Sequence, residues 1–203
     1  GVATESGATI QMFTDTENKA TLAKFAVVGT LIESRYASAT DESTALFHPN
    51  EGSKNDARSG FAVEGQGTSG FMKYFLQGLI TIVPSINDDA ATAKSAISST
   101  DEAVSHTPAY ALVSTASNSR SEQVQAGMLY AGLSLRARTL GLVMQPLSQA
   151  LQEYPDMAEP YEAIHDEYAS AGQTIQMMVR IGSPTTEYPT TMRRDATTLI
   201  RTS

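Results

Sequence analysis

The residues best suited to chemistry in this sequence are two adjacent arginines near its end, Arg193 and Arg194. An arginine side chain can hold a phosphate or carboxylate with two parallel N–H bonds, so two neighbours in a loop suit a phosphate dianion. All seven basic residues between 120 and 203 are arginines, whereas all five lysines precede that segment. The pair predicts a site for an anionic group, with ordinary pairing to surface carboxylates as the alternative.

A second candidate site lies earlier in the same part of the chain. A helical segment ends in Gly141-Leu142 and leads to Val143-Met144-Gln145-Pro146-Leu147-Ser148. A strand-like segment, Met177–Gly182, follows, and Met192 and the two arginines come ten residues after it. The order and spacing of these pieces make them more informative together than any one of them is alone.

Other nucleophiles and metal ligands are scarce. The chain has no cysteine, which excludes a thiolate nucleophile and a cysteine-bound zinc. The three histidines, His48, His106 and His165, are too far apart to form a local metal-binding motif. We therefore predict no metal site.

Acidic residues gather around His165. Glu162 and Asp166 lie one helical turn apart and share a face, with Glu167 beside them. Such a group can act as a general acid or base, but the opposite face carries Tyr161, Ile164 and Tyr168. A solvated polar helix face is the prediction, and catalysis is the alternative.

Three glycines, Gly65, Gly67 and Gly70, match the spacing of a dinucleotide-binding loop. That loop must lie between a buried strand and the start of a helix, where the pyrophosphate binds. Only Phe61–Val63 is available as the strand. Asp88 and Asp89 are at roughly the right distance for a ribose contact, but no second parallel strand leads to them. A flexible glycine loop is the prediction.

Composition excludes several classes of function. The 203 residues carry 14 basic and 22 acidic side chains, a formal net charge of −8, which argues against a general nucleic-acid binder. The longest apolar run, near Leu76 to Val83, is far short of the roughly 20 residues of a membrane span. Because no charged-then-apolar signal segment opens the chain, we expect a cytoplasmic protein without a membrane partner.

The elements that position these candidates follow from the periodicity of apolar residues. The front of the chain predicts a strand over Ala8–Phe13, a helix to about Arg35 with Thr14 and Glu17 as its capping box, and a long surface loop or arm over 37–70. Next come a helix over Phe71–Leu79, an extended piece over Ile80–Val83 and a helix over Asp88–Ser99.

The second part of the chain predicts a central strand, because Ala109–Ala116 is apolar on both faces. Ser119 and Glu122 form a capping box that opens a helix ending at Gly141, apolar around most of its circumference and therefore expected to be buried. A helix over Glu159–Ser170, a strand over Ile175–Ile181 and an extended piece over Asp195–Ile200 complete the list. Strands separated by helices predict a mixed sheet covered by helices.

Taken together, the segments from Ala109 to Ile200 resemble the C-terminal half of the nitroreductase-like, FMN-dependent oxidoreductases. In that family a long core helix with small residues leads to a Gly-Leu turn and then to a Pro-containing segment beside the flavin. A penultimate strand similar to Val179-Arg180-Ile181-Gly182 follows, and a basic pair grips the FMN phosphate. The match is weaker over residues 20–80.

The resemblance implies an α+β fold, a nitroreductase-like three-layer sandwich whose mixed, mostly antiparallel sheet is covered by helices. It makes residues 1–203 one nitroreductase-like domain, or part of a longer chain. It places Pro146, Leu147 and Ser148 against the isoalloxazine ring, Gln149 at the polar edge of the ring, and Arg193 and Arg194 on the phosphate. No side chain is catalytic in this scheme, because the flavin carries the chemistry.

Departures from the family pattern point to an incomplete site. The Arg-Ser-Arg-like opening element and the Asn-x-Gln-Pro-Trp-like loop of the family are missing, and the chain has no tryptophan. The front of the chain instead resembles the second half of two-halved members. The resemblance then implies a homodimer, or a pseudo-dimer with a second nitroreductase-like half that supplies the remaining flavin contacts.

The functional expectation is electron transfer from NAD(P)H through FMN to a small electron-poor acceptor, such as a nitroaromatic or a quinone. The alternative is a non-catalytic half that sequesters flavin or serves a structural role. A dinucleotide-binding enzyme built on the glycine loop is a third, weaker alternative.

Overall fold

The computed structural model describes residues 2–3, 7–36, 45–66, 89–187, 189–190, 192–195 and 197. Contacts within the chain divide it into two compact units, residues 1–35 with 93–184 and residues 36–92 with 185–203. The sequence predicts a single domain over residues 1–203. The division separates the two groups of candidate site residues, because residues 146–149 belong to the first unit and residues 193–194 to the second.

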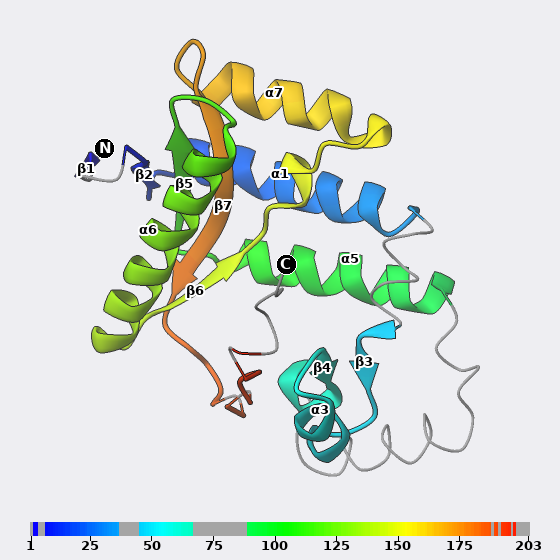
Figure 1. Ribbon diagram of the computed structural model, residues 1–203. Coiled ribbons are helices and arrows are strands. Elements are labelled where there is room, and N and C mark those ends of the chain that lie inside the picture. Colours follow the sequence, from blue (N-terminus) through cyan, green and yellow to red (C-terminus); the bar gives the residue numbers. More distant parts are fainter. Residues whose placement is uncertain are drawn as a thin grey trace. The chain divides into compact units, whose positions relative to one another are not determined.

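The first unit is built on a five-stranded sheet with the strand order β1-β2-β5-β7-β6 (Figure 1). The strands are β1 (Val2–Ala3), β2 (Thr9–Phe13), β5 (Ala109–Thr115), β6 (Val143–Pro146) and β7 (Thr174–Gly182). Every neighbouring pair in this sheet is antiparallel. The α+β class with a mostly antiparallel sheet is therefore confirmed.

Strand β5 occupies the centre of the sheet, as predicted. It pairs with β2 on one side and with β7 on the other, and every residue from Tyr110 to Thr115 is buried. Neighbouring side chains point to opposite faces of a sheet, so an unbroken buried run requires a cover on both faces. The predicted strands over Ala8–Phe13 and Ile175–Ile181 are also present, as β2 and β7.

Four long helices accompany this sheet: α1 (Thr16–Glu33), α5 (Asp89–Ser105), α6 (Arg120–Thr139) and α7 (Ala158–Tyr168). The N-cap of α1 is Asp15, whose carboxylate accepts the Asn18 N–H at 2.9 Å, rather than Thr14 as predicted. An aspartate at this position also gains from the positive end of the helix dipole. Ser119 caps α6 as predicted, and the Glu122 carboxylate accepts hydrogen bonds from Ser117 and Ser119.

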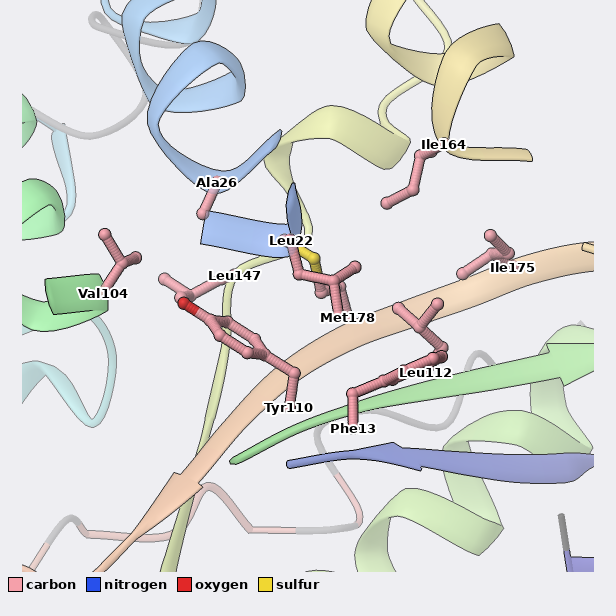
Figure 2. Close-up of a cluster of buried hydrophobic side chains, with 10 residues drawn as sticks. All are labelled: Phe13, Leu22, Ala26, Val104, Tyr110, Leu112, Leu147, Ile164, Ile175 and Met178. Atoms are coloured by element: carbon pink, nitrogen blue, oxygen red, sulfur yellow. The ribbon is translucent and has the colours of Figure 1, made fainter. Parts of the chain in front are cut away.

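The main core lies between the sheet and the helices α1, α5 and α7 (Figure 2). Tyr110 and Leu112 of β5 point to this side, where they meet Leu22 of α1 and Ile164 of α7. Ala111, the residue between them, points to the other face and joins Val179 in a smaller cluster. Tyr130 and Leu133 of α6 pack on that second cluster, so helices cover the sheet on both faces.

Helix α6 is not the buried helix that its composition predicts. Ala126 and Ala137 are buried, but the side chains of Val124, Met128 and Leu135 are 56%, 67% and 73% exposed. The apolar residues around the helix therefore divide into an inner face on the sheet and an outer face in contact with solvent. Composition alone does not distinguish these faces, because exposed and buried apolar residues look alike in a sequence.

The second unit contains α3 (Glu51–Ala57) between two short parallel strands, β3 (Phe47–His48) and β4 (Phe61–Ala62), followed by the 3-10 helix η1 (Val63–Gln66). The sequence predicts a loop or arm over residues 37–70, whereas residues 47–66 form these short elements. Asn50 caps α3 by accepting the Ser53 N–H at 2.9 Å, and the rings of Phe47 and Phe61 pack edge to face with centroids 5.7 Å apart. These elements are too short for the periodicity of apolar residues to reveal them.

Several predictions fall outside the described residues, among them the helix over Phe71–Leu79, the extended piece over Ile80–Val83 and most of Asp195–Ile200. The helix predicted over Asp88–Ser99 is present as α5 and continues to Ser105. Among the helices of the described part of the chain, none has the length and apolar character to cross a bilayer.

Candidate functional site

The segment Pro146–Gln149 lies where the edge strand β6 ends. Helix α6 closes at Leu140, and Gly141 takes a positive φ of 72°, a conformation that glycine adopts without steric cost. The Leu142 N–H donates to the carbonyl of Ala137 at 2.9 Å, which turns the chain back into β6. Pro146 is tolerated at the end of this strand because one side of an edge strand needs no N–H donor.

Two residues fix this segment to the neighbouring strand β7. The Leu147 N–H donates to the carbonyl of Met178 at 2.8 Å. The Ser148 hydroxyl donates to the same carbonyl at 3.1 Å and accepts the Met178 N–H, also at 3.1 Å. Through its side chain Ser148 thus continues the strand pairing past Pro146.

The side chain of Leu147 is part of the core. It is only 4% exposed and packs in the same cluster as Tyr110 and Met178 (Figure 2). Any contact between Leu147 and a ligand would therefore come from its backbone. The hydroxyl of Ser148 is already engaged on both sides, so the main role of these two residues is to hold the backbone in place.

Gln149 begins the 3-10 helix η3 (Gln149–Leu151), which packs closely on α1. A Cβ atom placed on Gly29 of α1 would lie 2.6 Å from the Ala150 nitrogen and 2.9 Å from Cβ of Gln149. The sequence analysis did not select Gly29. A glycine inside a helical pattern is the signal that points to such a close backbone approach.

Two amide oxygens near this contact are buried without a hydrogen-bond partner. They are Oε1 of Gln149 and Oε1 of Gln152. Nε2 of Gln152 donates to Oε1 of Glu33 at 2.8 Å, and this hydrogen bond fixes the orientation of the Gln152 amide. A buried acceptor without a donor costs free energy, so these two oxygens mark a polar position that the described side chains do not satisfy.

Arg193 and Arg194 lie in the second unit, and both are exposed. Nε of Arg194 donates to the backbone carbonyl of Arg58 at 3.3 Å. Arg58 is the C-cap of α3 and has a positive φ of 52°, which is uncommon for a residue with a side chain. The sequence analysis did not connect Arg58 with the pair, and no local pattern links residues so far apart in the chain.

No carboxylate pairs with Arg193 or Arg194 among the residues that the structure describes. In that part of the chain the single side-chain ion pair joins Lys54 to Glu51, with Nζ and Oε2 2.5 Å apart. Exposed guanidinium groups of this kind can bind an anion such as a phosphate.

The acidic group on α7 is solvent-exposed, as predicted, with Glu162, Asp166 and Glu167 all on the surface. His165 has a structural role instead. Its Nε2 accepts the Ile175 N–H at 3.0 Å, so Nδ1 is the donor to the carbonyl of Tyr161 at 2.7 Å. The ring thereby joins α7 to β7.

In the described part of the chain, the glycine motif does not follow a buried strand, as a dinucleotide-binding loop must. Gly65 lies inside the 3-10 helix η1, and the strand before it, β4, has two residues. Gly67, Gly70 and Asp88 fall outside the described residues.

Perturbed pKa values occur away from Pro146–Gln149. Hydrogen bonds from Ser117 and Ser119 lower the pKa of Glu122, and burial raises the pKa of the Tyr110 phenol. Burial, together with the nearby charge of Glu167, raises the pKa of Tyr168 to about 12. No group of three or more His, Asp or Glu side chains able to hold a metal ion is found within the described ranges.

Comparison with known proteins adds no assignment: neither the models of known protein families nor the curated proteins include a match to this chain. Hypotheses about its function therefore depend on the residues and contacts described above.

Proposed function

We propose that this chain is a nitroreductase-like half of an FMN-dependent oxidoreductase that passes electrons from NAD(P)H to a nitroaromatic or quinone-like acceptor. The order of elements supports this proposal. The long helix α6, the Gly141 turn, the edge strand β6 and the fixed Pro146–Gln149 segment succeed one another as the family resemblance requires. Strand β7, with its Val-Arg-Ile-Gly sequence, then pairs with β6.

The observation that carries the proposal is the buried oxygen of Gln149. A flavin presents an N–H donor at the polar edge of its ring, and Oε1 of Gln149 is an acceptor without a partner. The backbone of Gln149 is held in place in two ways. The neighbouring Ser148 is hydrogen-bonded to Met178, and Gly29 of α1 is in close contact with Gln149 and Ala150. Rigid support of this kind keeps a binding group in position before the ligand arrives.

In the proposed site, the backbone of Pro146, Leu147 and Ser148 lies against the flavin ring. Oε1 of Gln149 accepts a hydrogen bond from the N–H at the polar edge of the ring. Arg193 and Arg194 hold the phosphate, and the Arg58 carbonyl orients Arg194 while leaving its terminal nitrogens available. When bound, FMN supplies the hydride chemistry, and the protein supplies position and charge.

A second candidate function is flavin sequestration without turnover. The side chains of residues 146–149 are compatible with it, because none of them is ionisable. Such a segment binds and orients a ring but moves no proton. The two candidates share the binding site and differ only in whether bound flavin is reduced.

Titration of the full chain with FMN, followed by flavin fluorescence, tests the binding site. We expect saturable quenching, and we expect Gln149→Ala and Arg194→Ala each to weaken binding. The removal of Arg194 deletes a charge-assisted contact worth roughly 1.5–3 kcal/mol, or about 10- to 100-fold in affinity. Arg136→Ala is the matched control, because Arg136 is an exposed arginine on α6, outside the proposed site.

Absence of FMN binding by the wild-type chain would refute both candidates. If FMN binds, anaerobic addition of NADH or NADPH separates them. Loss of the flavin absorbance on addition, and its return with a nitroaromatic or quinone, identifies an oxidoreductase, whereas unchanged absorbance identifies a flavin store.

A further inference from the structure

Gln152 carries a buried polar group that the proposed site does not use. Its side-chain oxygen Oε1 is buried without a hydrogen-bond partner, like Oε1 of Gln149. The Gln152 N–H donates to the carbonyl of Gln149 at 3.1 Å and thereby closes the single turn of η3. Residues three apart in a 3-10 turn lie one above the other, so both glutamine side chains leave η3 on the same side.

That side of η3 meets helix α1. A Cβ atom placed on Gly29 would lie 2.9 Å from Cβ of Gln149. One helical turn further along α1, Oε1 of Glu33 accepts a hydrogen bond from Nε2 of Gln152 at 2.8 Å. Because residues 29 and 33 share a face of a helix, Gln149 and Gln152 are neighbours in one contact between α1 and η3.

The carboxylate of Glu33 determines which end of the Gln152 amide is left without a partner. An amide group has a donor end and an acceptor end, whereas an ionised carboxylate only accepts. The NH2 group of Gln152 must therefore face Glu33, and its oxygen must face away. Among the described residues the single ion pair joins Lys54 to Glu51, so no Lys or Arg side chain there competes with Gln152 for the Glu33 carboxylate.

Folding of the chain gives no reason for two such oxygens side by side. Each buried acceptor without a donor lowers stability, and an apolar side chain of similar size would avoid that cost. Departures from hydrogen-bond saturation are typical of positions that serve function rather than stability. The amide oxygens of Gln149 and Gln152 therefore have the character of groups kept for a ligand that brings its own donors.

We propose that Gln152 is a ligand-binding residue that accepts a hydrogen bond from a hydroxyl of the ribityl chain of FMN, and that Glu33 is the residue that positions it. This inference rests on the proposed function. FMN offers two kinds of donor, the N–H at the polar edge of its ring and the hydroxyl groups of its ribityl chain. Since Gln149 accepts from the N–H in the proposed site, the hydroxyls are the donors that remain for Gln152.

Flavins that lack parts of FMN test this assignment. Riboflavin has the ribityl chain without the phosphate, and lumiflavin has the ring without either, so neither depends on Arg193 or Arg194. We expect Gln152→Leu in the full chain to weaken riboflavin binding about 2- to 10-fold, the effect of one hydrogen bond, and to leave lumiflavin binding unchanged. Gln149→Leu should weaken the binding of both, because both carry the ring N–H. Fluorescence titration measures each affinity.

The role of Glu33 is tested by combining substitutions. Glu33→Ala is expected to weaken riboflavin binding by itself and to have no further effect in the Gln152→Leu variant, because Glu33 acts through Gln152. Glu162→Ala is the matched control, since Glu162 is an exposed carboxylate on α7. The same loss from Glu33→Ala with and without Gln152 would overturn the positioning role, because a purely structural effect does not depend on Gln152.

The outcomes separate this inference from the proposed function. Equal losses of riboflavin and lumiflavin affinity in Gln152→Leu, or no loss of either, would overturn the ribityl contact while the wild-type chain still binds FMN. Unchanged lumiflavin binding shows in addition that the variant is folded. A wild-type chain that binds none of the three flavins would overturn the proposed function and this inference together.

Discussion

At the scale of single residues, Ser148 shows how a short polar side chain organises a candidate site. Its hydroxyl both donates to and accepts from the backbone of Met178, at 3.1 Å in each case. Both hydrogen bonds extend the pairing of β6 with β7 beyond Pro146, the last residue of β6. Through these hydrogen bonds the side chain of Ser148 contributes to the position of the neighbouring Gln149.

Ser148→Ala is expected to lower the free energy of unfolding by about 1–2 kcal/mol, because it leaves the Met178 N–H without its partner in a buried strand. Ser148→Thr keeps the hydroxyl and serves as the control. Urea-induced unfolding of the three proteins measures the difference. Equal midpoints for wild type and Ser148→Ala would show that water replaces the hydroxyl.

Tyr168 gives a residue-scale prediction about alkaline pH. Its pKa is raised to about 12 in the folded chain, whereas an unfolded tyrosine has a value near 10. The raised value contributes stability that is fully present below pH ~10 and is lost as the pH rises to about 12, since the unfolded chain loses the proton first.

Tyr168→Phe should therefore reduce the loss of stability between pH ~10 and ~12. The phenyl ring keeps the edge-to-face contact with Phe13, whose centroid is 5.2 Å away. Unfolding by urea across this range, compared between wild type and variant, gives the measurement. Some alkaline dependence is expected to remain because Tyr110, Tyr130 and Tyr161 also have raised pKa values. Identical pH profiles would contradict this role for Tyr168.

At the scale of elements, two helices use glycine for different purposes. Gly29 of α1 allows the backbone of η3 to lie against the helix, and an added Cβ would come within 2.6 Å of the Ala150 nitrogen. Gly127 of α6 has open space around it. The same substitution should therefore have opposite effects on stability in the two helices.

Gly29→Ala is expected to destabilise the chain by about 1–3 kcal/mol, because two backbones must move apart. Gly127→Ala is expected to stabilise the chain by about 0.5–1 kcal/mol, through helix propensity alone. Thermal unfolding of the two variants and the wild-type chain compares them. A stabilising effect of Gly29→Ala would show that α1 and η3 are not in tight contact.

At the scale of the whole molecule, the candidate site residues fall into two groups. Pro146, Leu147, Ser148 and Gln149 are adjacent in the sequence and form one rigid segment in the first unit. Arg193 and Arg194 belong to the second unit, where the carbonyl of Arg58 accepts from Arg194.

Much of this arrangement follows from local sequence. The strands around Tyr110 and Val179 were predictable because their apolar runs suit a buried sheet, and Ser119 was predictable as a cap because its spacing to Glu122 is a local signal. The turn at Gly141 was predictable as well, because a glycine directly after a helix commonly takes a positive φ. Short-range patterns sufficed for these features because the interactions that fix them are also short-range.

The remaining features depend on contacts between residues far apart in the chain. The sequence by itself determined the α+β class, the central strand and the arginine pair, through apolar periodicity and residue chemistry. Only the tertiary structure decided which face of α6 is covered and which carbonyl orients Arg194. It alone also shows that the side-chain oxygen of Gln149 is buried without a hydrogen-bond partner. Burial and hydrogen-bond saturation depend on what packs against a residue, and that is settled only when distant segments come together.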